Sequence, residues 1–400
     1  MYDVAIVGAG LSGSICAAQL SSKGLNVALL DRKNKESFHI PESTYLTPKE
    51  TADLSGVTLE EIKGFFSNEA SVCFKSAEGN DSISIKQVMN EKTGPFILDR
   101  GRLDSFLLDK AIKQGCHYLP KLTVLGVEFE KSFNQLIISD DNEKQNLKTK
   151  FVVDASGKQA FLANQLNLKS DIAELDKRIS IFSHFINDNY YEAIKSSSVT
   201  IIEILDGYLY IIPLSNGRFT VGVTIDNKSY SNVLPKEVFY SSISKIDWLK
   251  QVLSESEQVL PFIPVINESF HVSRPSDHGY FIVGEALGFS DPFYCDGISF
   301  VLASVVGCVS GISELLSNAT PEKTYQKYNE LILSKRNNNG WHTFLNNSFG
   351  ISMRCLADPH IPYGLSHFLL KSFDSGVDSS IRKMEKVRSF FDISGAKHVD

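Results

Sequence analysis

The feature that most constrains the fold of this chain is a glycine-rich turn near the start of the sequence. Gly8, Gly10 and Gly13 stand between a short apolar, β-branched run at residues 4–7 and a stretch of helical composition at residues 14–23. In a strand–turn–helix unit, the first glycine permits a tight turn, the second lets a pyrophosphate approach the backbone, and the third allows the helix to pack closely on the sheet. The spacing therefore predicts a dinucleotide-binding βαβ unit.

An acidic residue supports the same interpretation. A second buried strand is predicted at residues 26–31, and it ends at Asp31, 18 residues beyond Gly13. A carboxylate at this place accepts hydrogen bonds from ribose hydroxyls, which favours FAD or NAD over a 2′-phosphorylated cofactor. No second glycine fingerprint follows a strand later in the sequence, so we expect one bound dinucleotide. The residues of this unit expected to contact it are Gly8, Gly10, Leu11, Ser12, Gly13, Asp31 and Arg32.

The composition excludes several classes of function. The chain has 400 residues with 40 basic and 47 acidic side chains, and a net charge of −7 does not suit a nucleic-acid partner. Its 6 cysteines form no C-x-x-C pair, so we expect no metal site and no disulfide framework, and a cytoplasmic location fits best. We find no export signal, and the most apolar stretch, residues 300–312, is shorter than the ~20 residues of a membrane span.

The rest of the chain divides by its hydrophobic pattern. Apolar spacing predicts a helix at residues 102–115 and a buried strand at residues 151–154. Alternating segments between residues 170 and 270 indicate an antiparallel sheet. A last strand at residues 280–283 precedes a buried helix from Gly297. The α/β pattern is thus interrupted by a predominantly antiparallel region.

Three later segments, taken in order, resemble those of one group of flavoproteins. Residues 97–104 contain an R-x-x-x-D pair, residues 152–157 read VVDASG, and residues 283–297 read VGEALGFSDPFYCDG. The third segment is similar to the flavin-binding stretch of flavin-dependent halogenases and their geranylgeranyl-reductase relatives, in the wider p-hydroxybenzoate-hydroxylase class. The resemblance covers most of residues 1–320 and implies FAD as the cofactor.

The resemblance also implies the architecture and further cofactor contacts. We expect an α/β fold in which a Rossmann-like FAD-binding domain (residues 1–60, 95–170 and 270–320) carries an inserted antiparallel β-sheet substrate domain (61–94 and 171–269), followed by a mainly helical region (321–400). Glu285 replaces the usual aspartate, and the helix from Gly297 is expected to direct its dipole at the flavin. The further expected contacts are Glu42, Ser43, Arg100, Asp154, Ala155, Gly157, Gly284, Glu285, Pro292, Gly297 and Ile298.

The sequence departs from a halogenase at the positions that handle the halogen. The resemblance aligns Cys73 with the active-site lysine, and Lys75 takes that position only after a shift in register. Tyr294 stands where indole halogenases have a glutamate. Asp296 falls at the halide-binding turn, where a carboxylate repels an anion. These differences together argue against halogenation.

Other side chains are candidates for the pocket and for acid–base chemistry. Tyr208 and Tyr210 replace two tryptophans of a halogenase strand and share one strand face, so we expect them, with Cys295, to line a substrate pocket; a pair of core aromatics is the alternative. His39 lies in a loop that resembles a motif at the flavin face, and histidine titrates near neutral pH. Asp296 is the candidate general base. The candidate catalytic residues are Asp296, Cys73, Lys75, Tyr294 and His39.

We therefore expect an FAD-dependent monooxygenase that hydroxylates an electron-rich aromatic substrate through a flavin C4a-hydroperoxide in a water-poor pocket. The substrate is expected to be an aromatic small molecule such as an indole, or a tryptophan carried on a partner protein. The flavin would be reduced by NAD(P)H or by a separate flavin reductase. The alternatives are a two-component flavin-dependent halogenase, a geranylgeranyl-reductase-like ene reductase, and a flavoprotein that binds and presents a partner protein.

Overall fold

The computed structural model divides the chain into two compact units. The first unit contains residues Met1–Phe66, Leu98–Ile172 and Ser269–Asn337, and the second contains Ser67–Ile97 and Ala173–Glu268 among its described residues. The structure describes residues 1–34, 42–44, 46–69, 71–75, 82–84, 96–140, 143–171, 178–194, 198–204, 207–214, 217–226, 233–267, 270–289 and 297–338.

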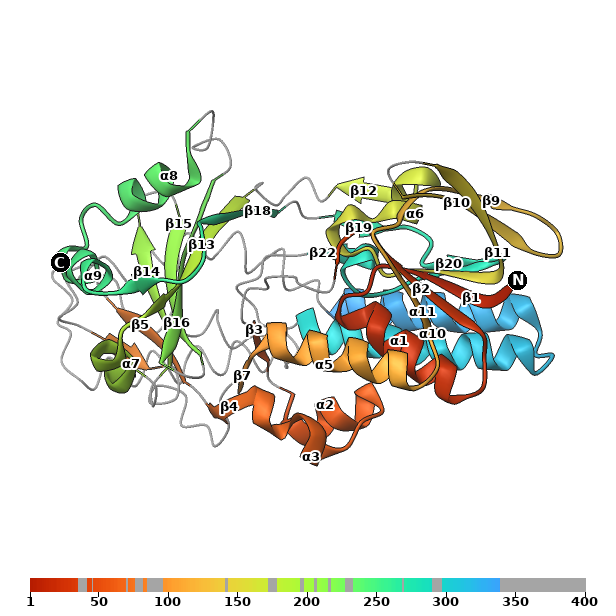
Figure 1. Cartoon of the computed structure of the whole chain (residues 1–400), viewed down its shortest axis with the longest axis horizontal. Helices are drawn as coiled ribbons and strands as arrows, with labels where there is room; N and C mark the ends of the chain where they lie inside the picture. The colour runs from red at the N-terminus through yellow and green to blue at the C-terminus, as the bar shows by residue number, and fades with distance from the viewer. Residues whose placement is uncertain are drawn as a thin grey trace, which may run out of the picture. The chain divides into compact units, whose positions relative to one another are not determined.

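A parallel sheet with an antiparallel extension forms the centre of the first unit (Figure 1). Its strands follow the order β20-β21-β11-β1-β2-β8, and β1 pairs in parallel with both β2 and β11. The carboxyl ends of β1, β2 and β11 therefore lie at one edge. The bounds are β1 Tyr2–Val7, β2 Val27–Asp31, β8 His117–Pro120, β9 Thr123–Phe129, β10 Asn134–Ser139, β11 Lys144–Asp154, β20 Ser276–Asp277 and β21 Tyr280–Ile282, with β9 and β10 extending β11 as an antiparallel meander.

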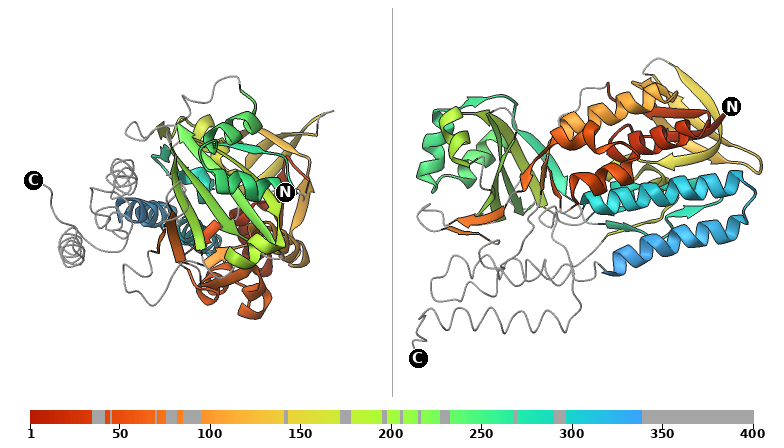
Figure 2. Two further views of the ribbon diagram at one scale, coloured as in Figure 1. Left: turned by 90° about the vertical axis from the view of Figure 1, so that its left-hand side faces the viewer. Right: turned by 90° about the horizontal axis from the view of Figure 1, so that it is seen from below.

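Helices pack beside this sheet because their apolar side chains complete one hydrophobic core. Helix α1 (Leu11–Ser22) lies between α5 (Arg100–Lys113) and α10 (Gly297–Leu316), in contact with both (Figures 1 and 2). Ile15, Leu107 and Leu302 are fully buried members of this core. The smaller helical elements are α2 Pro48–Ser55, α3 Leu59–Ile62, η1 Lys63–Phe65, η2 Gly157–Gln159, α6 Phe161–Gln165 and η4 Gly284–Leu287. Short strands complete the unit: β3 Glu42–Thr44, β12 Lys169–Asp171, β19 Phe270–Val272 and β22 Gly288–Phe289.

Helix α10 extends beyond the apolar stretch from which the sequence predicted it. It runs for 20 residues, and within the described parts of the chain it is the one helix long and apolar enough to cross a membrane. The whole helix therefore reaches the length of a span, which the apolar stretch at residues 300–312 does not. Half of its most apolar window is nevertheless buried, and Val305, Cys308 and Ile312 lie in the core. These contacts are those of a core helix.

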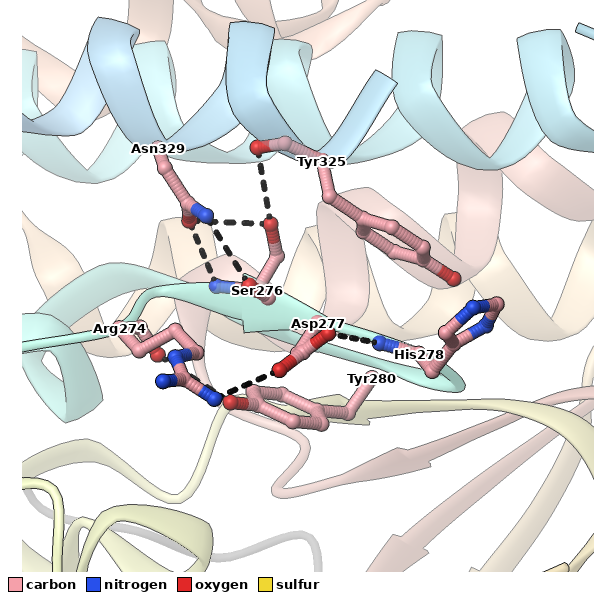
Figure 3. A network of polar contacts seen from close by, with 7 residues as sticks. All are labelled: Arg274, Ser276, Asp277, His278, Tyr280, Tyr325 and Asn329. Atoms are coloured by element: carbon pink, nitrogen blue, oxygen red, sulfur yellow. Dashed lines mark hydrogen bonds and ion pairs between the residues drawn. The ribbon is translucent and has the colours of Figure 1, made fainter. Parts of the chain in front are cut away.

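Helix α11 (Pro321–Asn338) is attached to the first unit by a polar network (Figure 3). Asn329 accepts hydrogen bonds from the backbone N–H (2.8 Å) and hydroxyl (3.0 Å) of Ser276, and its amide donates to the carbonyl of Ser276 (3.1 Å). Tyr325 accepts a bond from the N–H of Gly279, and Tyr328 donates to the carbonyl of Ile282. The sequence division had placed residues 321–337 in a separate helical region, whereas this network ties them to the first unit.

Replacing Asn329 with alanine should loosen this attachment. Ser276 is 1% exposed, so its N–H, carbonyl and hydroxyl would lose partners in a buried place, and we expect a loss of about 2 kcal/mol in the free energy of unfolding. Urea denaturation followed by circular dichroism measures it. Gln326→Ala on the exposed side of the same helix is the control and should change stability by less than about 0.5 kcal/mol. Equal effects of the two variants would contradict the assigned role.

The second unit is built on a mainly antiparallel sheet with strand order β17-β13-β16-β15-β14-β5-β6 and β18 beside β13. One face of this sheet packs against α7, α8 and α9, where Leu209, Val223 and Phe239 are buried in a separate core. The bounds are β5 Ser71–Lys75, β6 Ser82–Ser84, β13 Arg178–Ile186, α7 Asp188–Ile194, β14 Ser198–Ile204, β15 Gly207–Pro213, β16 Arg218–Asp226, α8 Pro235–Ser242, α9 Asp247–Ser254, β17 Glu257–Gln258 and β18 Ile263–Asn267. Strands β4 Phe66–Glu69 and β7 Phe96–Leu98 lie where the chain passes between units.

The predicted fold class is confirmed: a Rossmann-like α/β unit carries an inserted unit with an antiparallel sheet. Residues 339–400 lie outside the described residues.

Candidate cofactor site

The glycine-rich turn between β1 and α1 has the close packing that its spacing predicts. Gly8 has a φ of +105°, its N–H donates to the carbonyl of Leu30 (2.7 Å), and a Cβ there would collide with the carbonyl oxygen of Ala155. A Cβ on Gly13 would collide with the carbonyl oxygen of Gly8. Both glycines are therefore required for the turn, the helix and the neighbouring loop to approach each other.

The N-terminus of α1 is open in front of Gly10. Gly10 is the N-cap residue, it offers no side-chain cap, and the first turn carries no acidic residue. A Cβ on Gly10 would have no neighbouring atom within 4 Å. The first-turn amides of Leu11 and Ser12 have no acceptor within their own helix, and together with the helix dipole they suit an anionic group.

Asp31 at the end of β2 borders this turn. Its carboxylate accepts hydrogen bonds from the N–H of Ala9 (2.7 Å) and the N–H of Lys33 (2.8 Å). Each oxygen retains a free lone pair for a further donor, as a ribose hydroxyl would supply. The neighbouring Arg32 donates a hydrogen bond from Nη2 to the side-chain amide oxygen of Gln159 in η2 (2.9 Å). Gln159 was not anticipated from the sequence.

The loop after β11 forms a second wall of the site, and the aspartate that begins it is held by backbone amides. Asp154 is fully buried, and its carboxylate accepts bonds from the N–H groups of Ser156 (2.9 Å) and Leu162 (2.7 Å). Burial raises the pKa of Asp154, and these hydrogen bonds oppose the rise. The carboxylate thus positions the loop of Ala155 and Gly157 from inside, and the predicted cofactor contact of Asp154 stays a prediction.

The 3-10 helix η4 brings a third segment to the same place. Gly284 has a φ of +65°, and a Cβ on it would collide with the hydroxyl of Ser12, so only glycine fits there. Its N–H donates to Ser304 in α10 (2.9 Å), a residue that the sequence reasoning missed. Glu285 follows, and its Oε2 lies 4.0 Å from where a Cβ on Gly157 would stand. Among the described residues its carboxylate has no recorded hydrogen bond or ion pair.

Arg100 at the start of α5 is occupied by an ion pair. Its Nε and Nη2 lie 2.9 and 3.0 Å from the two carboxylate oxygens of Asp104, and the two side chains are 11% and 6% exposed. The R-x-x-x-D pair therefore forms within one helix turn. This geometry shows a structural role and leaves the predicted cofactor contact of Arg100 as a prediction.

The remaining predicted cofactor and catalytic residues are described in part or not at all. Gly297 and Ile298 begin α10; Gly297 is exposed and Ile298 is buried. Only the backbone is described for Glu42 and Ser43, in β3 beside α10, and for Cys73 and Lys75 in β5. The residues that lie outside the described residues are His39, Pro292, Tyr294, Cys295 and Asp296.

The two tyrosines predicted to line a pocket lie in the second unit, on the sheet face opposite α7, α8 and α9. Tyr208 and Tyr210 are 3% and 8% exposed, with ring centroids 6.4 Å apart. Strand register pairs Tyr210 with Ile201, and Ile201 with Phe74. Opposed residues share a face, so Val72 and Phe74 have register positions on the same face as the two tyrosines.

The two candidates for the halogenase lysine have register positions on the other face. Cys73 pairs with Thr200 and Lys75 pairs with Ile202, and these partners lie on the face that packs against the helices. The tyrosines and the two halogenase-lysine candidates thus have register positions on opposite faces of the sheet.

These features fit a dinucleotide. Three segments converge at the carboxyl edge of the sheet, an open helix N-terminus faces the space before Gly10, and Asp31 and Glu285 add acceptors beside it. In the described parts of the chain no group of three or more His, Cys, Asp or Glu residues is placed to hold a metal ion. The first unit is accordingly a Rossmann-type dinucleotide-binding domain.

Comparison with known proteins identifies the same class of domain and finds similar proteins over most of the chain. The family model described as an NAD(P)-binding Rossmann-like domain matches residues 6–61. A 1H-pyrrole-2-carbonyl-[peptidyl-carrier protein] chlorinase of Pseudomonas fluorescens is 26% identical over 375 residues, covering 86% of this chain and 82% of that protein. A digeranylgeranylglycerophospholipid reductase of Methanosarcina acetivorans is 23% identical, covering 74% of this chain and 72% of the reductase.

A solved structure shares the whole fold. The crystal structure of a mutant of the halogenase PltM in complex with FAD aligns with a TM-score of 0.75 at 17% identity, over 99% of this chain and 84% of that chain. The predicted resemblance to flavin-dependent halogenases and geranylgeranyl reductases is confirmed by these matches.

Proposed function

We propose that this chain is an FAD-dependent enzyme that halogenates an electron-rich aromatic ring. The observation that carries the proposal is the alignment with the pyrrole chlorinase, which extends over 86% of this chain and 82% of the relative. An alignment of this length includes both units and not only the dinucleotide fingerprint. The cofactor site described above supports the FAD part of the proposal independently.

The first unit would hold FAD through contacts that differ along the length of the cofactor. The amides of Leu11 and Ser12 would face the pyrophosphate, and Asp31 would accept from the adenosine ribose. Glu285, whose carboxylate has no hydrogen bond or ion pair among the described residues, would accept from hydroxyls of the ribityl chain. When bound and reduced, FAD supplies the two electron equivalents that activate dioxygen.

The proposed reaction replaces a ring C–H by a carbon–halogen bond. Reduced FAD, dioxygen, a halide ion, the aromatic ring and one proton give the halogenated ring, oxidised FAD and two molecules of water. The substrate class that the relative suggests is a five-membered aromatic acyl group carried as a thioester on a carrier protein. The reduced flavin would come from NAD(P)H directly or through a separate reductase.

Hydroxylation is the second candidate, and the register of the second-unit sheet favours it. Cys73 and Lys75 have register positions on the face opposite Tyr210, so no lysine of β5 shares the tyrosine face. Transfer of oxygen needs no lysine: reduced FAD, dioxygen and the ring give the hydroxylated ring, oxidised FAD and one molecule of water. Because halogenation and hydroxylation give different products, analysis of the product alone distinguishes the two reactions.

The test is product analysis with reduced flavin supplied by an unrelated reductase. Pyrrole-2-carbonyl carrier protein and free phenols are incubated aerobically with chloride or with bromide, and the products are identified by mass spectrometry. Halogen in the product is the expected result. Oxygen incorporation that is unaffected by halide would replace halogenation by hydroxylation, and turnover with an alkene lipid without dioxygen would reject both.

Lys75→Met examines the lysine itself. If Lys75 delivers the halogen, the variant should retain flavin and lose at least about 100-fold in the rate of halogenation, as is typical for loss of one catalytic group. Lys63→Met, an exposed lysine outside the site, is the matched control. Unchanged halogenation by Lys75→Met would remove this residue from the mechanism.

A further inference from the structure

The tyrosine-bearing face of the second-unit sheet is unusual because it is both buried and polar. We call this face the tyrosine face; strand register places on it Ser180, Phe182, His184, Tyr208, Tyr210, Thr220, Gly222 and Thr224, together with Ile201 and Ile212. The opposite side of the same strands carries aliphatic and phenylalanine side chains in the core with α7, α8 and α9. A sheet that served only packing would not need hydroxyls and an imidazole on its second side.

Most polar groups of the tyrosine face are paired with each other. Ser180 Oγ lies 2.8 Å from Thr224 Oγ1, and both residues are at most 2% exposed. His184 Nδ1 lies 2.9 Å from Thr220 Oγ1. Each pair forms a hydrogen bond between adjacent strands. Buried polar atoms on this face therefore generally have partners, as in most proteins.

Tyr210 is the exception on this face. It is 8% exposed, and within the described chain its hydroxyl has no recorded hydrogen-bond partner. Its ring lies over Gly222, where a Cβ would collide with the hydroxyl end of the ring. Burial alone raises the pKa of Tyr210, so the phenol stays protonated and available as a donor. The donor is therefore available to a ligand that supplies an acceptor.

We infer that the hydroxyl of Tyr210 donates a hydrogen bond to a carbonyl oxygen attached to the aromatic ring of the substrate, and that this bond determines specificity. The inference rests on the proposed function and assigns recognition of the acyl group on the ring, which a thioester or an amide presents, to one side chain. Gly222 is part of the arrangement because the absence of a Cβ leaves room for the hydroxyl end of the Tyr210 ring. Phe182, paired in register with Gly222, provides an aromatic neighbour on the same row.

The experiment compares two small probes that differ in the acceptor. Binding of 2-acetylpyrrole and of 2-ethylpyrrole to the FAD-loaded protein is measured by isothermal titration calorimetry. Tyr210→Phe removes one oxygen atom and keeps the ring over Gly222. We expect it to weaken 2-acetylpyrrole about 3- to 10-fold, the range for one hydrogen bond, and to change 2-ethylpyrrole less than about 2-fold.

The matched control is Tyr190→Phe, which removes a tyrosine hydroxyl from α7 on the helix-packed side of the same unit. It should leave the ratio of the two affinities unchanged. Gly222→Ala is the second variant: by displacing the phenol it should abolish discrimination between the probes while the ring of Tyr210 is still present. Thermal melting confirms that each variant is folded.

The outcomes separate this inference from the proposed function. If Tyr210→Phe weakens both probes equally or neither, or if the wild-type protein binds neither probe, recognition of a carbonyl by Tyr210 is rejected even where halogenation is observed. If discrimination is lost as expected but no aromatic substrate is halogenated or hydroxylated, the binding role of Tyr210 stands and the proposed reaction is wrong.

Discussion

Gly10→Ala should yield a folded protein that has lost its flavin. Gly10 has φ −76°, which any residue adopts, and a Cβ there has no neighbour within 4 Å. The protein itself therefore tolerates the methyl group. A pyrophosphate lying against the α1 N-terminus does not, and a steric conflict of this kind costs about 1–3 kcal/mol, or roughly a 5- to 150-fold loss of FAD affinity.

The neighbouring glycine provides the contrast. At Gly13 the added Cβ collides with the carbonyl oxygen of Gly8. The backbone of Gly8 is itself fixed by the hydrogen bond from its N–H to the carbonyl of Leu30. Since backbone cannot move aside as a flexible side chain can, Gly13→Ala should destabilise the fold itself by about 3 kcal/mol or more. One methyl group thus has two different effects three residues apart.

Two measurements on each variant distinguish these effects. Flavin content and FAD affinity are followed by absorbance and fluorescence, and stability of the apoprotein is followed by thermal denaturation. Gly101→Ala, in the first turn of α5 with its nearest neighbouring atom at 3.8 Å, is the control and should change neither. Full flavin retention by Gly10→Ala would show that the cofactor phosphates do not lie over this turn.

The cofactor site was largely predictable because its signals are local. Gly8, Gly10, Gly13 and Asp31 lie within one βαβ unit, where the order of strand, turn and helix already determines their relative positions. The Asp154 contact was not predictable in detail. Its segment was recognised by resemblance, but whether the carboxylate faces a ligand or the amides of Ser156 and Leu162 depends on the path of the following loop.

The second unit shows why the substrate side was harder to predict. Alternation within β15 correctly places Tyr208 and Tyr210 on one face, since that needs only one strand. The relation of Tyr210 to Cys73 or Lys75 depends on the register of β5 against β14, and a shift by one residue reverses every face. The strands β9 and β10 were missed for a similar reason: each has a more exposed side, and their place in the sheet depends on β9 pairing with β10 and β10 with β11.

The Arg100–Asp104 pair leads to the second large expected effect, because both charges are almost removed from water. Asp104→Ala leaves the guanidinium of Arg100 in a place where the side chain is 11% exposed, without the carboxylate that it contacts through two nitrogens. Loss of one partner of a buried ion pair costs about 3–5 kcal/mol, whereas apolar replacement of both partners is often neutral. We therefore expect Asp104→Ala to lower the free energy of unfolding by that amount.

The double variant Arg100→Met, Asp104→Leu should recover most of the loss, since it removes the uncompensated charge and keeps the volume. Arg100 takes part in at least one further interaction, so the recovery is expected to be incomplete. Arg102→Met is the matched control: this arginine lies on the same helix, over the ring of Phe65 at 5.2 Å, and should cost about 1 kcal/mol or less. Urea denaturation gives all three values, and flavin affinity measured in parallel shows whether Arg100 also acts on the cofactor. A cost below about 1 kcal/mol for Asp104→Ala would mean that water reaches the pair and would contradict its stabilising role.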